Sequence, residues 1–158
     1  MAISTGFVGT ALVTRLALDG IEVRACVRRD NTSARDDVHT VQVGDLAACA
    51  DWSGALVDVS VVVHAAARVH VMDDTAINPL AEFRRVNVDG TLNLARQAAA
   101  SGIRRFIFIS SIKVNGESTP LGHPFTAEDT PAPADPYGIS KHEAELGLRQ
   151  VATKPAWK

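Results

Sequence analysis

Hydrophobic and polar positions along the chain form short segments that predict strands alternating with helices. Apolar residues at helical spacing predict a helix from Phe7 to Leu18, closed by Gly20. Continuous apolar runs, many of them β-branched, predict strands at 22–27, 40–43, 59–63 and 104–109. Runs without a polar face are typical of strands that are covered on both sides.

Three more helices and a loop complete this pattern. We expect a weak helix at 48–56, a long helix at 76–100 with Pro79 near its start, and a final helix at 136–151. Residues 115–135 are rich in Pro and Gly and predict a loop. The alternation of strands and helices predicts an α/β fold with a doubly wound parallel sheet.

Composition and charge narrow the classes of function. The net charge of −2 gives no electrostatic argument for nucleic acid as a partner. We find no apolar run of the roughly 20 residues that cross a bilayer, and no signal-peptide pattern, so we expect a cytoplasmic protein without a membrane partner. Cys26 and Cys49 are expected to be reduced, buried thiols. The His and Cys spacing predicts no metal site.

Tyr137 and Lys141 are the strongest candidates for chemistry. Residues four apart lie on one face of a helix. A phenol titrates near pH ~10, and a neighbouring ammonium favours the phenolate. Ser110 or Ser111, at the end of the strand before the loop, could hold a substrate oxygen beside that phenol. A chance surface pair is the alternative interpretation of the Tyr/Lys spacing.

The segment from Thr5 to Gly9 opens the first helix and is a candidate phosphate-binding turn. Its glycines allow a pyrophosphate to approach the backbone N–H groups and the positive end of the helix dipole. An ordinary turn is the alternative. Ile3 stands where such a turn usually has a further glycine, and only Met1 and Ala2 precede it. We therefore expect the first strand of the sheet to be missing.

Arg28 follows the predicted strand at 22–27, and Asp45 follows the predicted strand at 40–43. An arginine after the strand at 22–27 suits a ribose 2′-phosphate, which favours NADP over NAD, and a solvated basic turn is the alternative. Asp45 could accept a hydrogen bond from an adenine amino group, or it could cap a helix.

Small residues and three polar residues mark the middle of the chain. Ala65–Ala67 leave room for a flat cofactor, and Arg68 is near enough in sequence to touch substrate. His64 is expected to be a packed side chain with no role in proton transfer. Asn87 is a poor mid-helix residue. It could hold backbone or water next to a catalytic lysine, or be a tolerated polar residue.

Six motifs in this order resemble the extended short-chain dehydrogenase/reductase family, with the nucleotide-sugar 4-epimerases and 4-keto-sugar reductases as the most similar branch. They are Thr-Gly-Phe-Val-Gly, Gly-Asp-Leu, His-Ala-Ala-Ala, Asn-Val-Asp-Gly-Thr, Ser-Ser-Ile-Lys-Val-Asn-Gly and Tyr-Gly-Ile-Ser-Lys. The resemblance implies a Rossmann-like domain over residues 1–151, followed by an unpatterned tail at 152–158. It also implies a UDP-sugar-type substrate and a homodimer through the long and final helices.

The resemblance further implies a role for each matching residue. Tyr137 would be the acid/base at a sugar 4-oxygen, Lys141 would support it and hold the nicotinamide ribose, and Ser111 would be the catalytic serine with Ser110 beside it. The remaining positions would bind NADP or NAD: Gly6, Phe7, Val8 and Gly9 at the pyrophosphate, Arg28, Asp45 and Leu46 at the adenosine end, Ala65, Ala66 and Ala67 under the second ribose, and Asn87 near Lys141.

The chain departs from the family pattern at both ends. It lacks the usual first strand, and after Val151 it has no segment that matches the substrate-binding lobe of the family. We therefore expect an inactive fragment of an epimerase or reductase. A dinucleotide-binding module without catalysis and a non-functional remnant are the alternative hypotheses.

Overall fold

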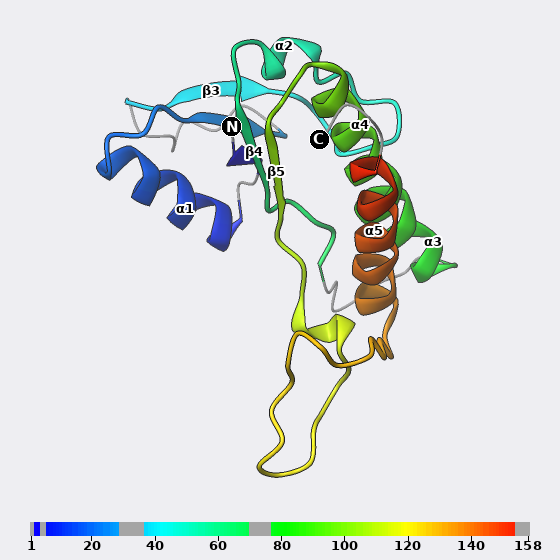
Figure 1. Cartoon of the computed structure of the whole chain (residues 1–158). Helices are drawn as coiled ribbons and strands as arrows, with labels where there is room; N and C mark the ends of the chain where they lie inside the picture. The colour runs from blue at the N-terminus through cyan, green and yellow to red at the C-terminus, as the bar shows by residue number, and fades with distance from the viewer. Residues whose placement is uncertain (1, 4–5, 29–36, 70–76, 154–158) are drawn as a thin grey trace.

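Strands and helices alternate along the computed structural model, which describes residues 2–3, 6–28, 37–69 and 77–153 (Figure 1). The strands are β1 (Ala2–Ile3), β2 (Arg24–Val27), β3 (His39–Gln42), β4 (Val61–His64) and β5 (Arg105–Phe108). The helices are α1 (Phe7–Leu18), α2 (Ser53–Leu56), α3 (Pro79–Phe83), α4 (Thr91–Ala100) and α5 (Pro136–Ala152), with a π-helical segment η1 (Arg84–Gly90) and a 3-10 turn η2 (Ile112–Val114).

The described strands form one parallel sheet in the order β3-β2-β1-β4-β5. The strand order reverses between β1 and β4, because the chain first builds outward to β3 and then returns to add β4 on the other side of β1. This is the doubly wound arrangement predicted from the sequence, and that prediction is confirmed.

The prediction that the first strand is missing is wrong. Ala2 and Ile3 form β1 at the centre of the sheet, where Ile3 lies opposite Cys26 of β2 on one side and His64 of β4 on the other. Without β1, backbone groups of β2 and β4 would face each other across a gap with no partner. Two residues are enough to join the two halves of the sheet.

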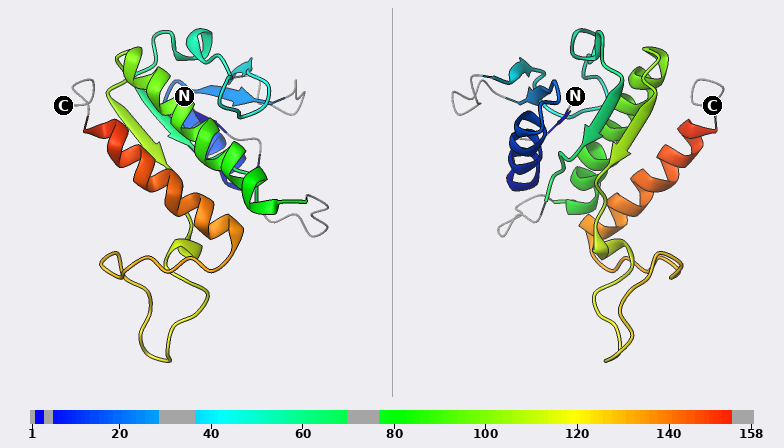
Figure 2. Two further views of the ribbon diagram at one scale, coloured as in Figure 1. Left: turned by 90° about the vertical axis from the view of Figure 1, so that its right-hand side faces the viewer. Right: turned by 60° about the vertical axis from the view of Figure 1, so that its left-hand side comes forward.

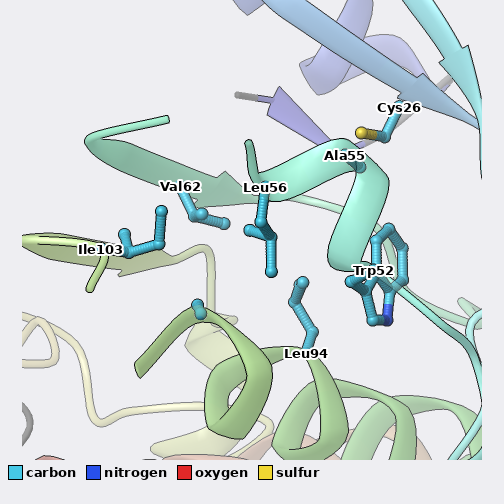
Figure 3. Packing of buried hydrophobic residues seen from close by; sticks show 8 residues of the cluster. Cys26, Trp52, Ala55, Leu56, Val62, Leu94 and Ile103 are labelled. Atoms are coloured by element: carbon cyan, nitrogen blue, oxygen red, sulfur yellow. The ribbon is translucent and has the colours of Figure 1, made fainter. Parts of the chain in front are cut away.

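Two hydrophobic clusters cover the two faces of the sheet. On one face α1 packs against β2, where its apolar positions meet Val23, Ala25 and Val38. On the other face lie α4 and α5 (Figure 2). Figure 3 shows Trp52 and Leu56 pointing toward Leu94 of α4 in the larger cluster on that face, which consists of Cys26, Trp52, Ala55, Leu56, Val62, Leu94, Ala98 and Ile103.

The predicted long helix is continuous but changes its pitch in the middle. It begins at Pro79, and the side chain of Asn78 caps it by accepting a hydrogen bond from the N–H of Ala81 at 3.1 Å. The central turns, Arg84–Gly90, are π-helical. Asn87 lies in this stretch, and wide turns of this kind are frequent at functional sites.

Several boundaries differ from the prediction. The weak helix expected at 48–56 shortens to α2, because residues 47–52 are held as a loop by polar side chains of α4. Cys26 is buried, and burial raises the pKa of its thiol to about 11. Cys49 is exposed, so the prediction that both thiols are buried is wrong for Cys49. None of the described helices is long and apolar enough to cross a bilayer.

The loop at 115–135 extends away from the sheet, as Figure 1 shows at its lower end. Its two ends meet where the N–H of Ala132 donates to the carbonyl of Val114 at 3.0 Å. The loop prediction is confirmed. The loop therefore leaves the end of β5 and returns to the start of α5 at nearly the same point.

We predict that Gly90→Ala destabilises the fold by about 1–3 kcal/mol, the usual effect of overpacking. A Cβ on Gly90 would lie 2.7 Å from Cγ of Leu46 and 3.0 Å from its carbonyl carbon. Urea unfolding followed by circular dichroism measures the change. Gly54→Ala is the matched control, because its Cβ would meet nothing within 4 Å. Equal changes in the two variants would contradict this account of the packing.

Candidate functional site

A cleft of about 790 Å³ opens where the strand order reverses. Its lining comes from segments that follow the carboxyl ends of β1, β2, β3 and β4, where ligands of doubly wound sheets bind. It also includes one side of η1. The lining residues are Gly6, Phe7, Val8, Cys26, Arg28, Val43, Gly44, Asp45, Leu46, Trp52, Ala65, Ala66, Ala67, Arg68, Val69, Arg85 and Val86.

The amino-terminal end of α1 forms one part of this lining. Gly6 occupies the cap position in an extended conformation and makes no side-chain hydrogen bond to the helix, and the first turn holds no acidic residue. The positive end of the helix dipole therefore faces the cleft, because Gly6, Phe7 and Val8 belong to the lining. Phe7 is 92% exposed and Gly9 is buried behind the turn, while Thr5 of the same motif lies outside the described residues.

Arg28 and Asp45 form an ion pair in the lining of the cleft. Nε of Arg28 lies 3.7 Å from Oδ1 of Asp45, with both side chains largely exposed. The alternative interpretation of Asp45 as a helix cap is wrong, because α2 begins only at Ser53, with Trp52 in the cap position. The lining of the cleft thus contains a cation whose charge is partly offset by a neighbouring carboxylate.

Two amide side chains on α4 hold the loop at residues 47–52, next to the cleft. The side chain of Asn93 donates to the carbonyl of Ala50 at 2.7 Å and to that of Ala47 at 3.2 Å. Gln97 also donates to Ala50, at 2.8 Å, and accepts from the N–H of Trp52, also at 2.8 Å. These bonds satisfy backbone groups that no strand or helix uses, and they fix the loop that places Leu46 and Trp52 in the cleft.

The final helix begins directly before Tyr137. Asp135 caps it, since its Oδ1 accepts from the N–H of Gly138 at 2.6 Å, and Pro136 occupies the first turn. Tyr137 is half-buried, and its ring lies edge-on to Phe83 with 6.1 Å between centroids. Further along the helix, the carboxylate of Glu143 accepts hydrogen bonds from Nε and Nη2 of Arg84 in η1. The helix is therefore anchored at its start and along its side.

Lys141 is buried and reaches the end of β5. Its Nζ donates to the carbonyl of Ile109 at 2.7 Å and lies 3.9 Å from the centroid of the Phe108 ring. Burial lowers the pKa of Lys141 from 10.5 to about 8, and Glu145 opposes that shift only in part. At neutral pH the side chain therefore carries a positive charge that is easily lost.

Ser110 and Ser111 follow the carbonyl that Lys141 binds. Oγ of Ser111 accepts a hydrogen bond from the N–H of Lys113 at 3.2 Å and caps η2, which leaves its own proton for donation. Oγ of Ser110 is buried, with no hydrogen-bond partner among the described residues. Both hydroxyls thus keep a hydrogen-bonding capacity that a bound molecule or water can use.

Asn87 connects the segment after β4 to α5, the helix that carries Tyr137. It is 2% exposed, and its amide pairs with both backbone groups of Arg68, accepting from the N–H at 2.7 Å and donating to the carbonyl at 2.9 Å. It also donates to Oγ of Ser140, which in turn donates to the carbonyl of Tyr137. Its burial and bonds exclude the interpretation of Asn87 as merely tolerated.

His64 is packed, as the sequence predicted. It is fully buried against Phe106 and Phe108, and its Nε2 lies 2.9 Å from Oγ1 of Thr91. Burial, and secondarily the charge of Lys141, lowers the pKa of His64 to about 3. The ring is therefore neutral at physiological pH and takes no proton there.

Comparison with known proteins decides the family. The family model described as NAD dependent epimerase/dehydratase matches residues 4–157. The chain belongs to this family. It is 53% identical over 150 residues to a UDP-glucose 4-epimerase of Vibrio cholerae, a match that covers 94% of this chain and 45% of that protein. The chain spans about half the length of the curated relatives that it matches along most of its own length.

Solved structures show the same architecture. A short-chain dehydrogenase/reductase superfamily protein from Agrobacterium tumefaciens with bound NAD superimposes with a TM-score of 0.81 at 32% identity, over 99% of this chain and 46% of that one. MoeE5 in complex with UDP-glucose and NAD gives 0.79 at 27% identity, over 99% and 50%. The Rossmann-like fold of an NAD-dependent enzyme family, expected from the motifs, is confirmed.

The epimerase/dehydratase site predicted from the motifs is divided between two groups of residues. The first group lines the cleft: Gly6, Phe7, Val8, Arg28, Asp45, Leu46, Ala65, Ala66 and Ala67. The second group, Asn87, Ser110, Ser111, Tyr137 and Lys141, lies along the junction of β5, η1 and α5. Motif reading missed Trp52 and Arg85 in the lining. They enter it through tertiary packing, and no local pattern marks them.

We predict that Lys141→Met stabilises this chain, and that the gain shrinks as the pH rises from about 8 to 10.5. The pKa of Lys141 is lowered on folding, so the unfolded chain binds more protons in that window. Native stability therefore rises with pH there, and the variant loses that rise, which amounts to roughly 3 kcal/mol. Urea titrations at pH 7.5, 9 and 10.5 measure it. A difference in stability that does not change with pH would contradict the burial of a titrating Lys141.

Proposed function

We propose that this chain forms the dinucleotide-binding and proton-transfer half of an enzyme that oxidises and reduces C4 of a UDP-sugar. The observation that supports this most is the hydrogen bond from Lys141 to the carbonyl of Ile109. It ties the helix of Tyr137 to the strand end that carries Ser110 and Ser111. The similarity to a UDP-glucose 4-epimerase and to a protein solved with UDP-glucose and NAD favours this substrate class.

The residues of the cleft fit a nicotinamide dinucleotide. The amino-terminal end of α1, with Gly6, Phe7, Val8 and Gly9, suits the pyrophosphate, and Ala65–Ala67 offer a surface without bulky side chains for the second ribose. Oγ of Ser110, which is buried and has no hydrogen-bond partner among the described residues, offers a further polar contact. When bound, the dinucleotide supplies the hydride acceptor and donor.

The chain's own residues account for the proton. Tyr137 would exchange a proton with the sugar 4-oxygen, and Ser111 would donate a hydrogen bond to that oxygen with the proton that η2 leaves free. Lys141, one turn beyond Tyr137 on the same helix face, would place a positive charge beside the phenol. Asn87 and Ser140 would hold the first turn of α5 while the proton moves.

The choice of cofactor and the outcome of the reaction belong to this proposal as well. Arg28 favours NADP in our proposal, whereas NAD is bound in several of the similar structures, including the two described above. Epimerisation and 4-keto reduction share the same first contacts, and both stay open. The homodimer through the long and final helices stays a prediction. So does the absence of turnover by the 158-residue chain alone, with a binding module and a non-functional remnant as the alternative hypotheses.

We predict that Tyr137→Phe lowers turnover of a UDP-sugar by about 10²–10⁴-fold, the usual loss when a general acid/base is removed. The assay uses the protein as its source cells make it, with UDP-glucose or UDP-galactose and NAD⁺ or NADP⁺, followed by NMR. Dinucleotide affinity should change less than about twofold, because the ring keeps its packing against Phe83. Unchanged turnover would remove Tyr137 from the mechanism.

We predict that Asp45→Asn strengthens NADP⁺ binding relative to NAD⁺, and that Arg28→Asp weakens it. The first change frees Arg28 from the carboxylate 3.7 Å away, and the second replaces the cation with an anion. Calorimetric titration with each dinucleotide gives the ratio of the two dissociation constants. If both variants leave that ratio unchanged, Arg28 does not distinguish the 2′-phosphate of NADP⁺ from the 2′-hydroxyl of NAD⁺.

A further inference from the structure

Lys113 lies between Ser111 and the first turn of α5, which carries Tyr137, and its backbone contacts both. Its N–H donates to Oγ of Ser111 at 3.2 Å. Its carbonyl oxygen lies against the first turn of α5, where a Cβ on Gly138 would come within 2.6 Å of it. Only a residue without a side chain fits there. The peptide groups of Lys113 therefore connect the turn of Ser111 directly to the residue that follows Tyr137.

The side chain of Lys113 makes a second connection to the same helix. Its Nζ lies 2.5 Å from Oε2 of Glu117 and 3.2 Å from Oδ2 of Asp135. The other oxygen of Asp135 caps α5 through the N–H of Gly138 at 2.6 Å. One carboxylate thus binds both the lysine and the helix, while Glu117 holds the ammonium from the loop side. The two carboxylates raise the pKa of Lys113, so it stays charged.

These contacts are poor candidates for a purely stabilising role. The side chain of Lys113 is 39% exposed, and ion pairs at such positions add little to the free energy of folding, because solvent screens them. Geometry is a different matter. A displacement of about 1 Å between reacting groups can lower a rate by 10²-fold, even where stability hardly changes. Lys113 is placed to control the distance between the Ser111 turn and the start of the helix of Tyr137.

We propose that Lys113 is a positioning residue, which fixes the start of α5, and with it the ring of Tyr137, relative to Ser111. It acts through Asp135 and the backbone and does not itself touch substrate. The inference rests on the proposed function for its effect on turnover. The structural part, that Lys113 orders Tyr137, stands separately and can be measured without any reaction.

The sequence allows a direct measurement, because the chain has a single tyrosine. Labelling with 3-fluorotyrosine gives one ¹⁹F resonance, which reports on the ring of Tyr137 alone. We expect Lys113→Met to broaden this resonance or to move it toward the position of the unfolded chain. Lys113→Arg keeps a cation that can bridge both carboxylates, so it should restore the wild-type resonance. Glu117→Gln keeps the contact with Asp135 and should have a smaller effect.

Two further readings complete the test. Arg15→Met is the matched control, because it breaks another exposed ion pair between residues four apart, that of Arg15 with Asp19 at the carboxyl-terminal end of α1. It should leave the resonance unchanged. In the protein as its source cells make it, Lys113→Met should lower kcat by about 10–100-fold with KM within about twofold. Melting curves of all variants should stay close to that of the wild type.

The outcomes separate this inference from the proposed function. An unchanged ¹⁹F resonance in Lys113→Met overturns the positioning role, whatever the activity. A shifted resonance that Lys113→Arg does not restore overturns the role of the cation. If the wild type turns over no UDP-sugar, the proposed function fails, while a resonance lost in Lys113→Met and restored in Lys113→Arg still supports the ordering of Tyr137.

Discussion

The parallel pairing of β1 with two neighbours is the constraint on which the rest of this structure depends. β1 has only two residues, yet it joins β2 and β3 on one side to β4 and β5 on the other. The cleft draws Arg28 and Asp45 from the first half and Ala65–Ala67 from the second. If β1 left the sheet, the two halves would lose their shared ladder and the cleft would lose its geometry. The short strand therefore matters for function as well as for stability.

Polar side chains of the helices fix the loops that connect the sheet to the site. Asn93 and Gln97 hold the loop after β3, and Asn87 holds the segment after β4 and the first turn of α5. Each satisfies backbone groups that lie outside regular secondary structure. The π-helical turns of η1 bring Asn87 to that position. One continuous helix from Pro79 to Ala100 thus positions both ends of the proposed site.

Local patterns in the sequence predicted the elements that local patterns determine. The helix Phe7–Leu18 begins and ends where predicted, because its apolar spacing and Gly20 are local signals, and the closing turn around Gly20 is seen in the bonds to Ala17 and Leu16. β1 was missed because two residues have no periodicity, and only pairing with distant strands makes them a strand. The helix at 48–56 was overestimated because Asn93 and Gln97, more than 40 residues away, hold its first half as a loop.

The candidate site divides in the same way. Short motifs predicted the glycine turn, the alanine surface and the Tyr137/Lys141 pair, since each depends on residue type at fixed spacing. Other contacts of the site join residues that are far apart in the sequence, so no local pattern could predict them. These are the contacts of Arg28 with Asp45, of Lys141 with the carbonyl of Ile109 and of Lys113 with Asp135.

The central claim is that the cleft at the reversal of strand order binds a nicotinamide dinucleotide. Calorimetric titration of this chain with NAD⁺ and NADP⁺ tests it most directly, with Ala66→Phe as a variant that fills the alanine surface and Gly54→Ala as its control. We predict saturable binding of one dinucleotide per chain, lost in Ala66→Phe and kept in Gly54→Ala. No saturable binding, or equal binding by both variants, would contradict the account.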